Sequence, residues 1–383
     1  MSGPLRVAVV ITRLEGGAGV LALRGLLALD RSEFRPVLIT GGVTGSGGRL
    51  LDRAARDAGL EVITEPALRS PISPPHDVSA LRSLSALLRR RPFDVVHTHT
   101  AKAGALGRIA ARRARVPRVV HTYHGFPFHE FQSRLRRAGY IAVERRLGRI
   151  TDVALCVGTG VAVEAVRRGL VPPERIRTIG VAVPAGPPLA LDARDRARRA
   201  LGISPDATVV GAVGRLTYQK APEDFLTAMR ELGRRGRPDA VGVWVGGGDL
   251  AERVGRLTRS ASGPRVVLAG ERADIPEILP AFDVFALPSR YEGLPTAIVE
   301  AMTCGIPVVA TAVNAVGDVV VPGETGLLVP PRRPDLLAEA VDYLLASPDA
   351  AARMAANARE RLGTRFNVTT LREVLVAAYT GVG

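Results

Sequence analysis

The sequence predicts an α/β protein with two doubly wound parallel-sheet domains. In each half of the chain, apolar runs rich in valine and isoleucine alternate with segments of helical pattern. Most of these runs are continuous rather than alternating, which is typical of parallel strands buried on both faces. Between the two series lies a segment rich in proline and glycine, 179–193, where a linker is expected. The length of 383 residues also favours two domains.

The predicted strands fall into two series. The first half of the chain contains runs at 6–12, 36–40, 61–64, 94–99 and 118–123. The second half contains runs at 208–214, 241–247, 265–270, 284–288 and 306–311. Helical segments separate most of them, as βαβ units require. Because α/β sheets bind ligands at the carboxyl ends of their strands, we expect the two domains to face one inter-domain cleft.

Composition excludes several classes of protein. Apolar residues make up 46% of the chain and the mean hydropathy is +0.14, so packed cores rather than disorder are expected. No apolar run approaches the roughly 20 residues of a membrane span, and residues 1–19 lack a basic head followed by an apolar signal core. The two cysteines, Cys156 and Cys304, stand in apolar settings, which fits core positions in a reducing compartment. We therefore expect a cytoplasmic protein.

The formal net charge of +15 predicts attraction to anionic partners. Lys102 and Lys220 are the only lysines among 52 basic residues, so part of the excess reflects a bias toward arginine codons. A predicted amphipathic helix at 132–150 is favoured as a solvated surface, with a site for an anionic membrane surface or a lipid phosphate as the alternative. Nucleic acid binding is not expected, because no aromatic platform and no recognition motif accompany this helix. Its arginines are Arg134, Arg136, Arg137, Arg145, Arg146 and Arg149.

A glycine-rich loop follows the first predicted strand. Gly16, Gly17 and Gly19 would let backbone N–H groups approach an anion at the start of the next helix. Residues 17–22 also match the G-x-G-x-x-A dinucleotide fingerprint, but no acidic residue follows the strand at 36–40 to bind a ribose. A loop that faces a phosphate or a sugar is therefore favoured over NAD binding and over a plain tight turn.

Five of the six histidines fall between His97 and His129. His97 and His99 lie two residues apart on one predicted strand, so they share a face and could chelate a metal. No carboxylate or thiol with suitable spacing accompanies them, which disfavours a metal site. His124 precedes Gly125 at the carboxyl end of another strand, where α/β proteins bind ligands. A functional role for His124 is favoured over a purely structural one.

Charged side chains gather around two strand ends in the second half. Arg215 and Lys220 flank one strand–helix turn, an arrangement suited to a diphosphate. Glu292 and Glu300 stand on either side of a helix start that Pro295 marks, and this helix is expected to run to residue 302. Phosphate oxygens would dock on its free N–H groups, with an acid on each side to accept hydrogen bonds from hydroxyl groups. A sugar on one side and a ribose on the other describe a nucleotide sugar.

These residues lie in sequence blocks that resemble the glycosyltransferases of family 4, which have the GT-B fold of two facing Rossmann-like domains. The blocks are VGRLTYQK, HTHTAKAGALGR, HTYHGFPFH, GETGLLVP and the E-x7-E pattern of Glu292 and Glu300, and they span nearly the whole chain. The resemblance implies an N-terminal acceptor-binding domain at 1–183 and a nucleotide-sugar-binding domain at 184–365. A C-terminal helix at 366–383 is expected to cross back to the first domain.

The resemblance also implies roles for single residues. His124 would lie at the reacting centre and Glu292 near the transferred sugar, which makes them the expected catalytic residues. Asn314 and Asp318 depart from the Gly-Gly and the acid that family members often carry in that segment. The residues implied in donor binding are Gly16, Gly17, Arg215, Lys220, Gly293, Leu294, Thr296 and Glu300.

The implied activity is the retaining transfer of a hexose-type sugar from a nucleotide-diphosphate sugar, with UDP favoured by its frequency in the family. The acceptor would be a hydroxyl of a lipid-linked or small molecule, and such enzymes need neither a metal nor another cofactor. The subgroup with HTHTAKAG and HGFPFH commonly builds polysaccharide repeat units on a lipid carrier, which suits peripheral attachment to the inner face of the cell membrane. A sugar-nucleotide 2-epimerase of the same fold and a non-catalytic nucleotide-sugar-binding protein are the alternatives.

Overall fold

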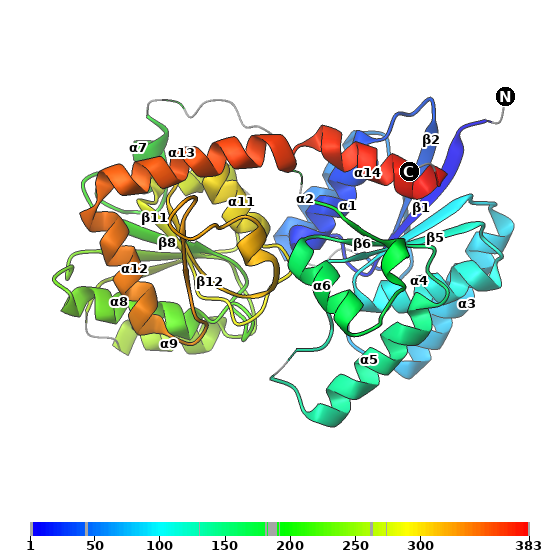
Figure 1. The fold of residues 1–383 in the computed structure, drawn as a ribbon, viewed down its shortest axis with the longest axis horizontal. Coiled ribbons are helices and arrows are strands. Elements are labelled where there is room, and N and C mark those ends of the chain that lie inside the picture. Colours follow the sequence, from blue (N-terminus) through cyan, green and yellow to red (C-terminus); the bar gives the residue numbers. More distant parts are fainter. Residues whose placement is uncertain are drawn as a thin grey trace. The chain divides into compact units, whose positions relative to one another are not determined.

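The computed structural model describes residues 3–42, 45–129, 131–180, 182, 190, 192–260, 263–272 and 274–381. The chain folds into two compact units, each with its own parallel sheet (Figure 1). Unit 1 comprises Met1–Ala182 and Val368–Gly383, and unit 2 comprises Val183–Asn367. Most of the predicted linker at 179–193 lies outside the described residues.

Unit 1 is built on a seven-stranded sheet with the order β3-β2-β1-β4-β5-β6-β7. The order reverses between β1 and β4, so the sheet is doubly wound and has its topological switch point between these strands. The strands are β1 (Leu5–Ile11), β2 (Phe34–Thr40), β3 (Glu61–Thr64), β4 (Val95–His99), β5 (Arg118–Tyr123), β6 (Val153–Cys156) and β7 (Ile176–Thr178). The α-helices are α1 (Gly16–Ala28), α2 (Gly45–Asp57), α3 (Pro74–Arg90), α4 (Ala101–Arg113), α5 (Arg134–Gly148), α6 (Thr159–Arg167) and α14 (Val368–Thr380).

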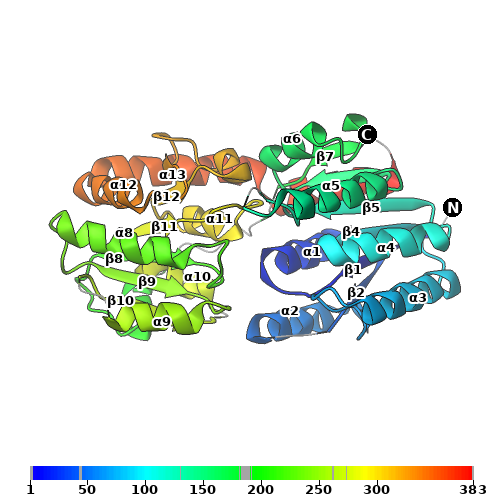
Figure 2. The ribbon, with the colours of Figure 1, turned by 90° about the horizontal axis from the view of Figure 1, so that it is seen from below.

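The sheet of unit 1 lies between two groups of helices. Strands β2, β1, β4 and β5 lie side by side in this order (Figure 2). Helix α1 contacts α2 and the C-terminal helix α14, whereas α4 contacts α3 and α5. The central strands β1 and β4 are buried almost throughout, because helices cover both of their faces. Their carboxyl ends carry the glycine loop and the histidines.

Unit 2 is built on a six-stranded parallel sheet with the order β10-β9-β8-β11-β12-β13, and its switch point lies between β8 and β11. Its core packs around Trp244 and Phe225. The strands are β8 (Val209–Val213), β9 (Val241–Val245), β10 (Val266–Gly270), β11 (Val284–Leu287), β12 (Val308–Thr311) and β13 (Leu327–Val329). The α-helices are α7 (Ala193–Ala200), α8 (Pro222–Arg234), α9 (Ala251–Ser260), α10 (Ile275–Ile278), α11 (Thr296–Thr303), α12 (Pro334–Ala346) and α13 (Pro348–Arg365).

The two parallel sheets confirm the predicted α/β class, and every predicted strand is present within two residues of its expected bounds. Strands β6, β7 and β13 were not predicted. Each has only three or four residues, too few for a distinctive pattern. Cys156 lies in the core as expected, whereas Cys304 is only partly buried because it follows the last residue of α11.

The predicted arginine-rich helix is α5, which is shorter at both ends than 132–150. One face is anchored in unit 1 by an ion pair of 2.9 Å between Glu144 and the fully buried Arg108. The outer face leaves Leu135 exposed to 85% and Val143 to 49%. Among the described helices, none combines the length and the apolar content that a membrane span requires.

Candidate active site

The glycine loop of unit 1 follows β1 at the switch point of its sheet. Gly16 begins α1 with a φ of 59°, a left-handed conformation that favours glycine. A Cβ on Gly19 would lie 2.8 Å from the backbone carbonyl carbon of Leu14, so packing also requires glycine there. The first turn of α1 contains no acidic residue. The acidic residue nearest to this helix start is its N-cap Glu15, whose carboxylate lies 2.9 Å from the guanidinium of Arg13, and the loop presents backbone N–H groups at the positive end of the α1 dipole.

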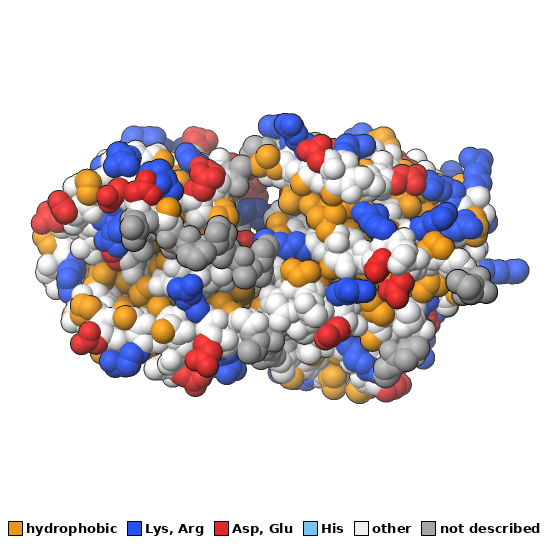
Figure 3. Space-filling view, turned by 90° about the horizontal axis from the view of Figure 1, so that it is seen from above, with side chains coloured by type: hydrophobic (Ala, Val, Ile, Leu, Met, Phe, Trp, Pro, Cys, Tyr) orange, Lys and Arg blue, Asp and Glu red, His pale blue; other side chains and the backbone are white. Residues whose placement is uncertain are grey.

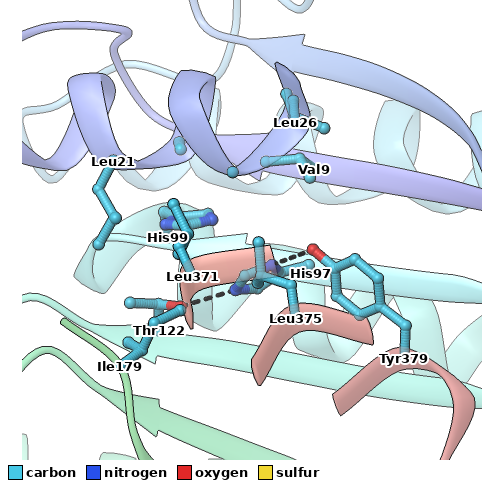
Figure 4. Close-up of a pocket in the computed structure, with 12 residues that line it drawn as sticks. Val9, Leu21, Leu26, His97, His99, Thr122, Ile179, Leu371, Leu375 and Tyr379 are labelled. Carbon is cyan, nitrogen blue, oxygen red and sulfur yellow. Dashed lines mark hydrogen bonds between the residues drawn. The ribbon is translucent and has the colours of Figure 1, made fainter. Parts of the chain in front are cut away.

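Three histidines on β4 and β5 are buried and hydrogen-bonded. Both ring nitrogens of His97 are engaged at 2.7 Å, Nδ1 with the hydroxyl of Tyr379 and Nε2 with the hydroxyl of Thr122 (Figure 4). Nδ1 of His121 lies 2.8 Å from the hydroxyl of Thr98 on the neighbouring strand. Among the described residues, no group of three or more histidine, cysteine, aspartate or glutamate side chains is arranged to hold a metal ion.

His124 follows β5 and keeps part of its surface exposed. Its Nε2 lies 2.8 Å from Nδ1 of His99, at the end of β4. Desolvation by burial lowers the pKa of His124 to about 4, so the ring is neutral at pH 7. The next residue, Gly125, has a φ of 141°, which a residue with a Cβ rarely adopts. A neutral imidazole is thus held at a strand end that glycine allows to turn sharply.

The predicted diphosphate turn of unit 2 follows β8. Arg215 is exposed, whereas the side chain of Lys220 is only 14% exposed. A Cβ on Gly214 would lie 3.2 Å from Cδ of Lys220, so glycine makes room for the lysine stem. Ala221 adopts a left-handed φ of 52°, and α8 begins at Pro222. The turn therefore directs the ammonium group toward a neighbouring strand end.

That neighbouring strand end carries Glu292, and the two side chains form an ion pair that the sequence did not predict. Nζ of Lys220 lies 2.5 Å from Oε1 of Glu292. The hydroxyl of Ser289 donates to the same oxygen at 2.6 Å, and Nε2 of Gln219 donates to Oε2 at 3.3 Å. Glu292 is only 7% exposed. The carboxylate is therefore compensated by three donors inside unit 2.

Asn314, the residue that departs from the family pattern, also contacts this site. Its Oδ1 accepts a hydrogen bond of 3.0 Å from the backbone N–H of Glu292. Asn314 has a φ of 45°, a conformation that asparagine tolerates better than most residues. Ser289, Gln219 and Asn314 were not predicted as site residues. Gln219 is next to Lys220 in the sequence, and Ser289 lies three residues before Glu292. Their position beside predicted site residues is the feature of the sequence that could have identified them.

The predicted helix after Pro295 is confirmed as α11, and it ends one residue later than expected. No side chain caps its amino terminus, and its first turn contains no acidic residue. Gly293 and Leu294 are buried in the preceding turn, whereas Thr296 and Glu300 keep part of their surface exposed. The helix start therefore offers N–H groups and a positive dipole end to an anion.

All of these groups of unit 2 stand at the carboxyl ends of β8, β11 and β12, which are neighbours in the sheet. The structure therefore brings the turn of Arg215 and Lys220, Glu292 and the start of α11 to the switch point. Two cationic side chains and a helix dipole can bind a diphosphate there, with carboxylates for hydroxyl groups. The glycine loop and His124 occupy the corresponding end of the sheet in unit 1.

Comparison with known families matches both units of the chain. Residues 15–185 match Glycosyltransferase Family 4, and residues 193–361 match Glycosyl transferases group 1. In fold, the chain is similar to Anabaena HepE in complex with UDP and glucose, with a TM-score of 0.83 at 20% identity over 99% of this chain and 100% of HepE. It is also similar to WaaG, a glycosyltransferase involved in lipopolysaccharide biosynthesis, with a TM-score of 0.75 at 19% identity over 98% and 100% of the two chains.

Sequence relatives support the same assignment. A UDP-Gal:α-D-GlcNAc-diphosphoundecaprenol α-1,3-galactosyltransferase from Escherichia coli is 36% identical over 67% of this chain and 68% of its own length. An α-D-kanosaminyltransferase from Streptomyces kanamyceticus is 32% identical over 77% of this chain and 79% of its own length. The two family matches agree with the similarity in fold over the whole chain and with the 36% sequence identity to the galactosyltransferase. The chain therefore belongs to the family 4, group 1 glycosyltransferases with the GT-B fold.

Proposed function

We propose that this protein is a retaining hexosyltransferase that moves a sugar from a UDP-sugar to a hydroxyl group. The observation that carries the proposal is the cluster at the switch point of unit 2. Arg215, Lys220 and the start of α11 stand there at neighbouring strand ends, together with Glu292 and Glu300. The cluster combines positive charge for a diphosphate with carboxylates for the hydroxyl groups of two sugars.

In this proposal, the donor diphosphate binds between the strand–helix turn and α11. The exposed Arg215 and the ammonium of Lys220 supply two charge-assisted hydrogen bonds. The backbone N–H groups around Thr296 bind phosphate oxygens, because no side chain caps this helix. Gly293 and Leu294 shape the buried turn that leads into it.

Three further groups bind the sugars. Glu300 accepts hydrogen bonds from the ribose, and Glu292 lies beside the transferred sugar. His124 orients that sugar from unit 1, and the loop of Gly16 and Gly17 closes over the phosphate. Support comes from the partial exposure of Glu300 and His124 and from the backbone N–H groups and positive dipole end of α1 at Gly16.

The proposed chemistry needs no carboxylate nucleophile. A double displacement would use a carboxylate beside the anomeric carbon. Oε1 of Glu292, the candidate for that role, is already bonded to Lys220 and Ser289. We therefore infer that the departing diphosphate accepts the proton of the incoming hydroxyl on the same face. Arg215, Lys220 and the α11 dipole stabilise the charge that develops on the leaving group, a task for which no metal is required.

Relatives support the choice of donor and acceptor. The structure of HepE is known in complex with UDP-glucose, and the galactosyltransferase from Escherichia coli is named for UDP-Gal and a diphosphoundecaprenol acceptor. The α-D-kanosaminyltransferase from Streptomyces kanamyceticus is named for transfer of a different sugar, so the relatives do not all share one substrate. A lipid-linked acceptor is therefore favoured for this chain, with a small-molecule acceptor as the second choice.

The function is tested by the stereochemistry of the product. Purified protein is incubated with UDP-hexoses and hydroxyl acceptors, and the anomeric coupling of the product is measured by NMR. We expect an α-linked product from an α-linked donor, with a yield that EDTA does not lower. A β-linked product would contradict the mechanism. Omitting the acceptor tests the alternatives, because a 2-epimerase converts the donor alone and a non-catalytic protein binds UDP without turnover.

We also propose that α5 attaches the protein to the inner face of the cell membrane. Leu135 and Val143 are exposed on its outer face, and five of the six arginines of the 132–150 segment are exposed as well. Such a surface combines apolar side chains with positive charge, as an interfacial helix does. On the face drawn in Figure 3, by comparison, acidic side chains are interspersed with basic and hydrophobic ones. Nucleic acid is not proposed as a partner.

Membrane attachment is tested by flotation with vesicles. The protein should float with vesicles that contain anionic lipid and stay behind with neutral ones, and the effect should fade as salt shortens the Debye length from about 10 Å at 0.1 M. A variant with Arg134→Gln, Leu135→Gln and Arg136→Gln should lose binding. The matched control Arg89→Gln and Arg90→Gln removes two exposed charges from α3 and should float like the wild type. Equal loss in both variants would point to net charge rather than to α5.

A further inference from the structure

Three imidazole rings form a row in unit 1 that ends at His124. The ring centroids of His97 and His99 lie 4.2 Å apart, and those of His99 and His124 lie 5.1 Å apart. His97 and His99 are 1% and 3% exposed, whereas His124 keeps part of its surface exposed. The row therefore leads from the interior of unit 1 to the histidine that we place at the transferred sugar.

The inner end of the row is fixed from two sides. His97 lies between the hydroxyls of Thr122 and Tyr379, which engage both of its nitrogens (Figure 4). Tyr379 belongs to the C-terminal helix α14 and is itself 4% exposed. Because both nitrogens of His97 are bonded, its ring cannot rotate without losing buried hydrogen bonds. His97 therefore offers a fixed surface to the ring of His99.

His99 occupies the middle of the row. It lines a small pocket together with Leu21 of α1 and Leu371 of α14 (Figure 4). Its Nδ1 lies 2.8 Å from Nε2 of His124, and that contact joins two neutral rings, because burial holds the pKa of both below the usual range. One ring must donate and the other must accept. The hydrogen bond therefore favours one tautomer of His124 and one orientation of its ring.

We propose that His99 is a positioning residue that fixes the tautomer and the orientation of His124 toward the reacting sugar. The proposal rests on the function proposed above, because it assigns His99 a role only through His124. Residues that do not touch the substrate themselves commonly hold a functional histidine in this way, by a hydrogen bond to its other ring nitrogen. The ring of His97 packs against His99 and is itself held by Thr122 and Tyr379. In this proposal, these three residues act on the sugar only through His99.

The test uses two variants of nearly equal shape. His99→Asn places an amide close to the position of Nδ1, whereas His99→Leu has the same branching without a polar atom. We expect His99→Leu to lower the kcat of UDP-hexose turnover by about 10-fold, the scale of one net hydrogen bond, with little change in KM. His99→Asn should recover most of that loss. Equal losses in the two variants would overturn the proposal.

A double-mutant cycle separates positioning from a general packing defect. In a His124→Ala background, His99→Leu should change kcat by less than about two-fold, because its only route to the reaction has been removed. If His99→Leu costs as much with alanine at position 124 as with histidine, His99 does not act through His124. Affinity for UDP, measured by calorimetry, should be the same in all variants, because the proposed nucleotide site lies in unit 2.

A spectroscopic measurement tests the hydrogen bond independently of activity. In protein labelled with ¹⁵N-histidine, the ring nitrogens of His124 should show a single tautomer in the wild type and in His99→Asn. In His99→Leu, they should shift toward an average of the two tautomers. An unchanged His124 signal in His99→Leu would overturn the inference even if the enzyme is active. Absence of turnover with every donor would instead count against the proposed function, and the tautomer result would still stand.

Discussion

Replacing Lys220 by methionine should weaken the binding of UDP about 10- to 100-fold, the scale of losing one charge-assisted hydrogen bond. It should also lower the free energy of unfolding of unit 2 by about 3–5 kcal/mol, the typical cost of removing one partner of a buried ion pair. The structure supplies the reason for the second effect, because Glu292 would remain only 7% exposed without its cation. Calorimetry with UDP measures the first effect. Urea unfolding followed by the fluorescence of Trp244, the only tryptophan, measures the second.

A second substitution separates the two effects of Lys220→Met. When Glu292→Gln is added, the buried charge disappears, so most of the lost stability should return. The affinity for UDP should stay low, because the ammonium that binds the diphosphate is still absent. If the double variant recovered both properties, Lys220 would serve only to neutralise Glu292. An affinity that is unchanged in the single variant would remove Lys220 from the donor site.

Much of the fold could be predicted because long buried strands leave a clear signal. Runs such as 6–12 and 118–123 are continuous and rich in β-branched residues, as parallel strands with helices on both faces require. Strand β13 was missed because three residues of extended chain resemble any loop, even though they lie inside the quoted GETGLLVP block. The order of strands in each sheet also depends on crossovers that no local pattern encodes.

The sequence predicted at which strand ends the site residues lie, but it did not predict which side chains contact one another. Glycines, histidines and charged residues that follow strands could be placed at the edge of a parallel sheet, and the structure places them there. The ion pair of Lys220 with Glu292 joins residues 72 positions apart, and the contact of His97 with Tyr379 joins residues 282 positions apart. Such pairs depend on the packing of β8 beside β11 and of α14 in unit 1. A single sequence does not report that packing.

The burial of histidines in unit 1 also makes its stability depend strongly on pH. Burial lowers the pKa of His97 to about 3 and that of His124 to about 4, and it lowers those of His99 and His121 well below the usual range. The unfolded chain titrates these groups near their ordinary pKa of roughly 6.5, so it binds more protons than the folded chain below that pH. The stabilisation is thus complete above about pH 6.5 and is lost as the pH falls toward the folded-state values.

On acidification below about pH 6.5, unit 1 should therefore lose up to about 5–6 kcal/mol of unfolding free energy per pH unit, because four histidines with lowered pKa values each contribute about 1.4. Hydrogen exchange of β4 and β5, corrected for the intrinsic pH dependence of exchange, measures this loss. Unit 2 is the internal control, because all six histidines lie between residues 76 and 129 and Trp244 reports on unit 2 alone. His121→Asn keeps an amide near Nδ1 and removes one of the four titrating groups, so it should reduce the slope by about a quarter. A slope that this variant leaves unchanged would show that carboxylates, rather than the buried histidines, control the acid sensitivity of unit 1.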